Sequence, residues 1–229
     1  MNKEELVKKI EEIDKDFESI VYEERTAIKD GVVDVDAYLL ADLRIMWILK
    51  EVNSPDDEEW DMRDVLNNLK STSGTTIKEG WGSTFNSIVY TTYGILNNLY
   101  WEDIPNTDVT PEIIDVLKKI AFVNVKKVSG GSKAIHNSLV DFHNQFGYIL
   151  KKQIESFNPD VIICGNTMEI IDEFGNQYEF LKENGMDFYT SEKHILVDAF
   201  HPNNSKLTQE TYCDTIIKNV LAWKEKYKK

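Results

Sequence analysis

The sequence has few of the residues that mark metal-binding or redox-active proteins. Its 229 residues include only two cysteines and four histidines. Cys164 and Cys213 are far apart in the chain and match no metal or redox spacing. Cys164 lies within an apolar run, which favours a small core residue over a reactive thiol. No cofactor and no bound metal are therefore predicted.

Long apolar runs are also missing. No run approaches the roughly 20 residues of a membrane span, and residues 1–9 lack the apolar segment of a signal peptide. We therefore expect a cytoplasmic protein with no membrane-spanning segment. The hydrophobic fraction of 41%, with ten Phe, ten Tyr and five Trp, still allows a substantial core, so the chain is not expected to be disordered.

Positive charge is scarce overall, but it is concentrated in one segment. The chain has 26 basic and 40 acidic residues, which gives a net charge of −14. Because Lys and Arg supply most of the non-specific affinity for nucleic acid, general adhesion to nucleic acid is not expected. Residues 118–154 are the exception, with seven lysines against Asp141 as the single acid. This segment forms either two ordinary solvated helix faces or a local patch that faces a phosphate-bearing ligand.

Four short apolar runs predict buried strands, because each has the length and composition of a strand that is covered on both faces. They are residues 45–49, 120–125, 161–165 and 194–200. Apolar residues at three- and four-residue spacing predict helices around these runs. The main predicted helices cover residues 4–24, 61–70, 84–99, 134–157, 166–183 and 208–227, and another begins at Pro111.

Strands that alternate with helices favour a parallel sheet with helices on both faces. The predicted fold is therefore a three-layer α/β/α domain with a central four-stranded parallel sheet. No repeat, low-complexity tract or linker divides the chain, so residues 1–229 are predicted to form a single domain. An N-terminal helical extension is expected at about residues 1–40.

Polar residues follow each predicted strand at its carboxyl end. In chain order they are Glu51 and Asn53, then Asn124 and Lys126, then Gly165-Asn166-Thr167, and finally His201-Pro202-Asn203-Asn204. In a parallel sheet these ends lie at one edge, so residues far apart in sequence are expected to line a single crevice. The loop Ser129-Gly130-Gly131-Ser132 is either a phosphate cradle in front of a helix or a plain turn.

In these stretches the chain resembles the uracil-DNA glycosylase superfamily, nearest to its bacterial family 4 and 5 branches. The resemblance covers the sheet-forming parts of residues 44–223. Residues 48–53 fall where the family has an apolar strand followed by Gly-Glu-Ala-Pro-Gly, and residues 122–126 are similar to its Thr-Asn-Val-Val-Lys strand. Residues 148–155 and 159–165 look like the family's helix and following strand, and residues 201–204 fall on its terminal His-Pro-Ser motif.

This resemblance implies an enzyme that hydrolyses the N-glycosidic bond of uracil or a related damaged base in DNA. Glu51 would be the carboxylate that positions water or stabilises the sugar cation. Asn124 would read the flipped base, because an amide both donates and accepts hydrogen bonds. His201 would hydrogen-bond the base carbonyl oxygen as negative charge develops on it. The expected partner is DNA or another ligand that contains a nucleobase.

Further binding residues follow from the same comparison. Asn53 and Asn203 are candidates for base binding, and Trp60 is a candidate stacking wall because of its place in the loop after the first strand. The candidates for phosphate binding, in the lysine-rich segment, are Lys126, Ser129 and Ser132.

The chain departs from the family pattern in its first motif. It lacks the glycines and the proline there, and Val52 stands where several branches carry a water-activating Asp or Asn. Two cysteines are also too few for the iron–sulfur cluster of family 4. Two alternatives therefore stay open. One is a nucleobase- or nucleotide-binding domain without catalysis, and the other is a metal-dependent hydrolase that uses His201 and the acids at positions 56–59 and 61.

Overall fold

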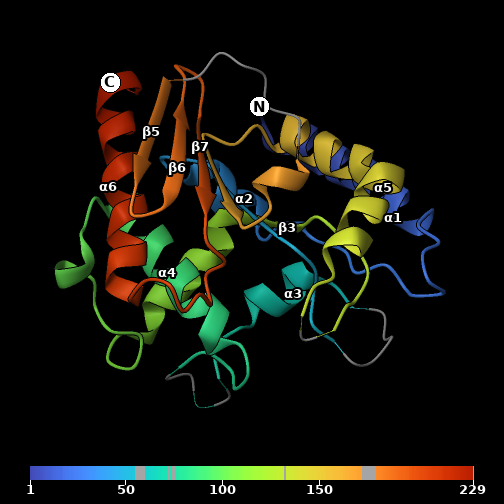
Figure 1. Ribbon diagram of the computed structural model, residues 1–229, viewed down its shortest axis with the longest axis horizontal. Coiled ribbons are helices and arrows are strands. Elements are labelled where there is room, and N and C mark those ends of the chain that lie inside the picture. The colour runs from blue at the N-terminus through green and yellow to red at the C-terminus, as the bar shows by residue number, and fades with distance from the viewer. Residues whose placement is uncertain (55–59, 72, 74–75, 132, 172–178, 229) are drawn as a thin grey trace.

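The central strands of the fold are those that the apolar runs predict. The computed structural model describes residues 1–54, 60–71, 73, 76–131, 133–171 and 179–228. Its seven strands are β1 (Gly31–Val32), β2 (Ile45–Leu49), β3 (Ile120–Asn124), β4 (Val161–Gly165), β5 (Glu179–Glu183), β6 (Met186–Thr190) and β7 (Ile195–Ala199). They form one sheet in the order β1-β3-β2-β4-β7-β6-β5 (Figure 1).

The prediction of an α/β fold is confirmed, but that of a four-stranded parallel sheet is wrong. The four predicted strands do lie side by side and parallel, as β3-β2-β4-β7. The sheet then continues on both sides with antiparallel strands. β1 pairs with β3 at one edge, and β6 and β5 extend the other edge beyond β7. The sheet is therefore mixed.

The extra strands on the β7 side lie partly where a helix is expected. Residues 166–183 contain only the short 3₁₀ helix η3 (Met168–Ile170) and then strand β5, while residues 172–178 lie outside the described part of the chain. Asn184 and Gly185, which read as a helix end, join β5 to β6 with φ angles of 50° and 77°. Positive φ at both positions is what a two-residue hairpin turn requires, and Asn-Gly is its preferred sequence.

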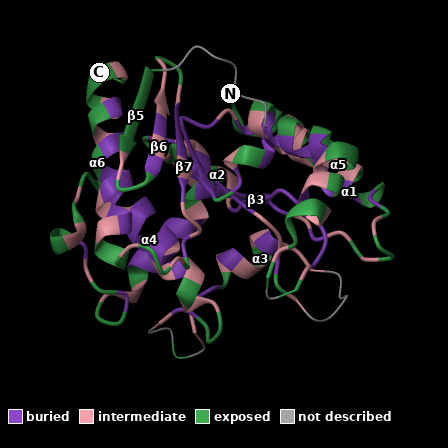
Figure 2. Ribbon diagram, in the orientation of Figure 1, coloured by how far each residue is buried: buried purple, intermediate pink, exposed green. Residues whose placement is uncertain are grey.

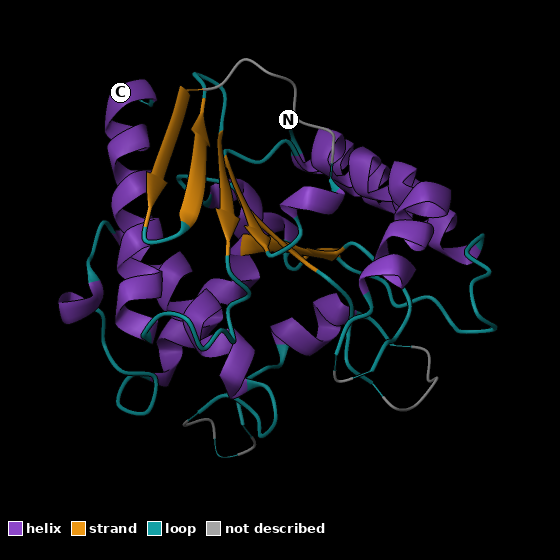
Figure 3. Ribbon diagram, in the orientation of Figure 1, coloured by secondary structure: helices purple, strands orange, loops and turns teal. Residues whose placement is uncertain are grey.

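Helices cover both faces of the sheet, as the three-layer prediction requires (Figure 3). The α-helices are α1 (Lys3–Glu18), α2 (Val35–Leu40), α3 (Met62–Asn67), α4 (Gly82–Asn97), α5 (His136–Phe157) and α6 (Gln209–Tyr227). Two further 3₁₀ helices are η1 (Trp101–Asp103) and η2 (Pro111–Lys119). α4 and α6 lie on one face, and α1 and α5 lie on the other.

Strand β2 shows how the two layers share the sheet. Alternate residues of a strand point to opposite faces. Ile45, Trp47 and Leu49 therefore join the core on the α4 side, while Met46 and Ile48 join the core on the α5 side. All five are buried (Figure 2). A strand that is buried on both faces needs a continuous apolar run, which explains why this strand is visible in the sequence.

The N-terminal region is more than a helical extension. α1 and α2 are helices as expected, and α1 begins with a capping box in which Asn2 and Glu5 bond each other's backbone. Between these helices, however, residues 27–33 run along the edge of the sheet as an extended segment. β1 pairs with β3, and the Ile28 amide donates to the Lys127 carbonyl at 2.6 Å. Within the described residues, no helix is both long and apolar enough to cross a membrane.

Candidate functional site

The carboxyl ends of the parallel strands form the candidate site. β2 has β3 on one side and β4 on the other, so the strand order reverses at β2. In open α/β sheets the ligand crevice lies outside the strand ends at such a reversal. Beyond the sheet the loops after β2 and β3 continue to bond each other. The Lys126 amide donates to the Lys50 carbonyl at 2.9 Å, and the Gly130 amide donates to the Val52 carbonyl at 2.8 Å.

The loops after β4 and β7 close the other side of this edge. The buried Thr167 hydroxyl donates to the Ile48 carbonyl at 3.1 Å, and the Asn166 amide donates to the Ala199 carbonyl at 2.7 Å. Gly165 has no side chain, which allows Leu49 and Pro202 to lie close to its backbone. A Cβ at this position would lie 2.3 Å from Leu49 Cδ2 and 3.2 Å from Pro202 Cδ. The four strand ends therefore meet at one edge, as the sequence predicts.

Glu51 lies in this edge as one half of a buried ion pair. Its Oε2 atom is 3.2 Å from Lys126 Nζ, and both side chains are only 5% exposed. That oxygen makes no aligned hydrogen bond to any described residue. The carboxylate rests on Gly130, where an added Cβ would lie 2.1 Å from Glu51 Cδ. The structure thus brings together two predicted site residues, Glu51 and Lys126. The absence of a side chain at Gly130 leaves room for the Glu51 carboxylate.

Lys126 has further neighbours outside the predicted site. Its ammonium donates to the Ser138 hydroxyl at 3.0 Å, lies 3.6 Å from a Glu23 carboxylate oxygen, and lies 5.5 Å from the centre of the Tyr22 ring. Ser129, in the same loop, accepts a hydrogen bond at 2.8 Å from Arg25 Nη1. Nothing in the sequence from Tyr22 to Arg25 signals a site, so this contribution of the N-terminal region is not predicted from the sequence.

Asn124 is the last residue of strand β3. The residue is 2% exposed, and its backbone amide donates to Asp30 Oδ2 at 2.8 Å. Its side-chain amide makes no hydrogen bond to the residues that the structure describes. The amide is not fully enclosed, so it is available to water or to a ligand. Asn124 stays a predicted base-binding residue.

Trp60 lies on the α4 face of the sheet, which is also the face of Asn124. Its ring meets Trp81 edge-on at 6.3 Å between centroids, and the row continues through Phe85 to Phe122. Phe122 and Asn124 are two residues apart on β3, so their side chains share a face. Lys126 instead contacts α5 through Ser138, and Glu51 pairs with Lys126. The candidate residues therefore form two groups on opposite sides of the sheet edge.

His201 follows β7 and is a neutral hydrogen-bond donor at neutral pH. Burial lowers the pKa of His201, and the Lys50 cation lowers it further. Its Nδ1 atom accepts a hydrogen bond at 3.1 Å from the Asn203 backbone amide, so we assign the imidazole proton to Nε2. Asn203 itself is exposed and acts here through its backbone. The arrangement leaves the Nε2–H group to donate to another molecule.

The remaining predicted residues lie around this edge. Asn53 is exposed and forms a β-bridge with Gly130, which places it next to the Glu51 carboxylate. Ser132 lies outside the described residues, as do the four acids at positions 56–59 on which the metal-dependent alternative depends. The described residues contain no group of three or more His, Cys, Asp or Glu side chains that could hold a metal ion.

A buried polar network supports the loop after β3 from behind. Lys127 donates to Asp30 at 2.8 and 3.1 Å and to Gln153 at 2.7 Å. Gln153 donates in turn to Asp30 Oδ1 at 2.8 Å. Burial lowers the pKa of Lys127, while the Asp30 carboxylate opposes that shift. All three side chains are buried, so this network fixes the start of the loop that carries Lys126 and Ser129.

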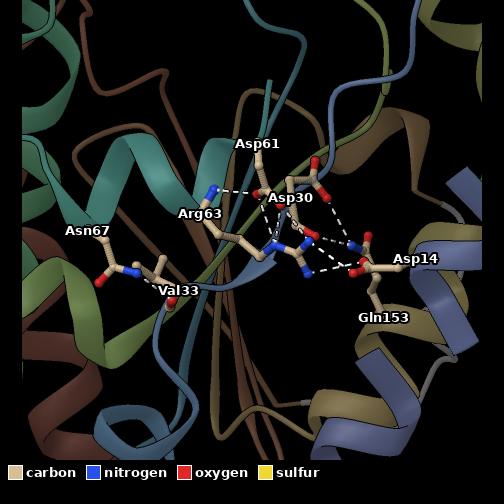
Figure 4. Close-up of polar contacts among 7 residues, drawn as sticks. All are labelled: Asp14, Asp30, Val33, Asp61, Arg63, Asn67 and Gln153. Atoms are coloured by element: carbon tan, nitrogen blue, oxygen red, sulfur yellow. Dashed lines mark hydrogen bonds and ion pairs between the residues drawn. The ribbon is translucent and has the colours of Figure 1, made fainter. Parts of the chain in front are cut away.

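Arg63 joins the same region to helices α1 and α3. Its guanidinium bonds Asp61 at 2.6 to 3.0 Å and both carboxylate oxygens of Asp14 at 3.0 Å (Figure 4). These hydrogen bonds raise the pKa of Arg63 despite its burial. Asp30 and Gln153 lie beside this cluster in Figure 4. Charge pairs therefore hold the N-terminal segment against the body of the domain.

A hollow of about 450 Å³ lies away from the strand ends, between the end of α3 and η2. Its lining is polar and includes three lysines and one acid: Asn67, Asn68, Lys70, Lys78, Asp115 and Lys118. Lys70 and Lys118 both pair with Asp115, and these contacts lower the pKa of that carboxyl group although burial opposes the shift. The hollow holds none of the residues that the sequence predicts for the site.

Comparison with known proteins adds no further assignment. No family model matches this chain, and no curated protein matches it. The resemblance to the uracil-DNA glycosylase superfamily stays an expectation from the residues and the order of the four motifs.

Proposed function

We propose that the protein is a base-excision enzyme of the uracil-DNA glycosylase type. The observation that carries the proposal is the pair of unused polar groups at the strand ends, namely the side-chain amide of Asn124 and the Nε2–H group of His201. An amide without a partner suits the Watson–Crick edge of a flipped base. A neutral imidazole that donates suits a carbonyl oxygen on which negative charge develops.

The proposed reaction assigns a role to each strand-end group. Water adds to the sugar carbon C1′ and gives up a proton to solvent. The bond between C1′ and the base nitrogen breaks, its electron pair leaves with the base, and the base anion takes up a proton from solvent. His201 hydrogen-bonds the oxygen on which that charge is delocalised. Glu51 offsets the positive charge that develops on the sugar, because a carboxylate stabilises an oxocarbenium-like state. Asn124 holds the base in register.

A second candidate is a nucleobase-binding domain without catalysis, and two observations favour it. Val52, at the position where several branches carry a water-activating side chain, is apolar and buried. Glu51 is engaged with Lys126 at 3.2 Å. The same strand-end groups would then bind a base without cleaving its glycosidic bond.

Uracil-containing oligonucleotides separate the two candidates. Single- and double-stranded substrates are incubated with the protein in EDTA and then treated with alkali, which breaks the strand at every abasic site. We expect alkali-labile breaks with the wild-type protein and a loss of at least about 100-fold in His201→Ala, the scale of a lost oxyanion donor. His136→Ala is the matched control, because His136 is exposed and its ion pair among the described residues is with Glu169, at 3.5 Å.

Two other outcomes of this experiment would support a different function. No breaks, together with uracil binding by calorimetry that Asn124→Ala abolishes, would establish the binding domain. Breaks that need added magnesium would contradict both candidates and support the metal-dependent hydrolase.

A further inference from the structure

The turn at Tyr22–Arg25 has an unusual backbone. Glu23 and Glu24 have φ angles of 51° and 55°, so two successive residues with a Cβ occupy the left-handed region. This conformation is unfavourable for such residues and persists where surrounding contacts hold it. The Tyr22 ring supplies these contacts, because it packs edge-on against Phe142 at 5.1 Å between centroids. The Arg25 amide closes the turn by donating to the Tyr22 carbonyl at 3.0 Å.

The turn places one positive and one negative side chain, Arg25 and Glu23, against the loop after β3. Arg25 Nη1 donates to the Ser129 hydroxyl at 2.8 Å, and a Glu23 carboxylate oxygen lies 3.6 Å from Lys126 Nζ. The two acids near Lys126 differ in burial. The Glu51 side chain is 5% exposed, whereas that of Glu23 is 50% exposed. Glu23 is therefore the acid that can leave while Lys126 keeps a buried partner.

We propose that Arg25, Lys126 and Ser129 form a phosphate-binding subsite, and that Glu23 competes for it with its own carboxylate. The assignment of this phosphate to a DNA strand rests on the proposed function. The ability of the three side chains to bind a phosphate group does not depend on it. A phosphodiester offers acceptor oxygens to a guanidinium, an ammonium and a hydroxyl together. An exposed acid beyond hydrogen-bond distance is a weak competitor, because pairs of this kind change an equilibrium by at most about fivefold.

Glu23 and Glu24 provide a matched pair of substitutions for a test. Both are exposed, both have positive φ, and replacing either with Gln removes one negative charge from the same turn. They differ in their contacts, since the structure pairs Glu23 with Lys126 and shows no ion pair between Glu24 and another described residue. An effect of general charge would therefore appear in both variants, whereas competition for Lys126 would appear in Glu23→Gln alone.

The experiment measures binding of a fluorescently labelled thymine oligonucleotide, which contains no uracil, by anisotropy at low ionic strength. We expect Glu23→Gln to bind about two- to fivefold more tightly than wild type and Glu24→Gln to bind like wild type. Arg25→Gln should bind about tenfold more weakly, as expected for a lost charge-assisted hydrogen bond, and Arg25→Lys should fall between. Thermal unfolding of each variant verifies that it is folded.

Two results would overturn the proposal. One is an equal effect of Glu23→Gln and Glu24→Gln, and the other is an absence of oligonucleotide binding in both wild type and Glu23→Gln. Failure of the proposed function gives a different pattern. In that case uracil is not excised, yet Glu23→Gln still binds the thymine oligonucleotide more tightly than Glu24→Gln does.

Discussion

Lys126 and Lys127 are neighbours in the sequence and both are almost fully buried, yet their surroundings differ. Lys127 is 1% exposed and donates three hydrogen bonds, two to Asp30 and one to Gln153. Lys126 is 4% exposed and donates one hydrogen bond, to Ser138. Its two acids, Glu51 and Glu23, lie at 3.2 and 3.6 Å without the alignment of hydrogen bonds.

This difference separates a structural charge from one that can serve a ligand. An ammonium group has three donors, and around Lys127 all three are used within the protein. A buried charge that is satisfied in this way holds its surroundings in one arrangement. Lys126 keeps looser contacts, so a ligand anion can replace one of them. Proximity in sequence therefore says little about the role of either lysine.

The largest expected effect is on stability, from Lys127→Met. This change leaves Asp30 buried without its cation, and breaking a buried pair in this way costs about 3–5 kcal/mol. Lys126→Met also leaves a buried acid, Glu51, without its cation, but it removes one hydrogen bond instead of three, so we expect a smaller cost of about 2–3 kcal/mol. Urea unfolding of the two variants measures both values. Equal losses would show that the two lysines do not differ as we infer.

Gly130→Ala should have the next largest effect on stability. It disturbs the contact between Glu51 and Lys126 but not the hydrogen bonds of Lys127. The added methyl group would lie 2.1 Å from Glu51 Cδ and would push the carboxylate away from Lys126. Overpacking of this kind costs about 1–3 kcal/mol of stability. Gly131→Ala is the control, since a Cβ there meets nothing within 4 Å. Thermal unfolding of the two variants should separate them, and similar melting temperatures would contradict the prediction.

Asp198 extends the comparison to a half-buried charge that has an acid, Asp187, opposite it on the neighbouring strand. Burial raises the pKa of Asp198 to about 6, and Asp187, its partner across β6 and β7, contributes to the rise. The folded state therefore keeps this proton to higher pH than the unfolded state, so stability falls as pH rises from about 4 to about 6.

We expect Asp198→Asn to stabilise the protein by about 1 kcal/mol at pH 7, after a reduction for solvent screening at this half-buried position. Below pH 4 both proteins carry a neutral side chain at this position, so the gain should disappear. Unfolding curves at the two pH values test this, and a gain that is equal at both would refute the assigned cause.

The smallest expected effect concerns His201 and rests on the proposed function. The hydrogen bond that Nδ1 accepts from Asn203 requires a neutral imidazole, so excision should be constant near neutral pH and fall in acid below the ordinary pKa of histidine. Lys50→Gln removes a cation that lowers the pKa of His201, so the acid limb should move to higher pH. Lys151→Gln, on an exposed position of α5, should leave it in place. A pH–rate profile of each variant supplies the measurement.

Particular residues show how far the sequence predicts this fold. The runs at 45–49, 120–125, 161–165 and 194–200 contain β2, β3, β4 and β7, which are buried on both faces except at Asp198, so their mostly apolar character signals them directly. β5 has no such signal, because its side chains are mainly exposed and it pairs through a hairpin turn. Its Asn184-Gly185 turn reads equally well as the end of a helix.

The candidate site divides in the same way. Glu51, Asn124 and His201 are predicted from the sequence because each lies at, or two residues beyond, the end of a recognisable strand. Tyr22, Glu23 and Arg25 follow none and were missed.

The sequence by itself determined the four central strands, the two helical layers and the edge at which polar residues gather. These features depend on local patterns of apolar and polar residues, which burial imposes along each element. Only the tertiary structure decided which neighbours those polar residues have. It placed Lys127 on Asp30, Lys126 between two acids, and Arg25 on Ser129. Such pairings join residues that are far apart in the chain, and no local pattern encodes them.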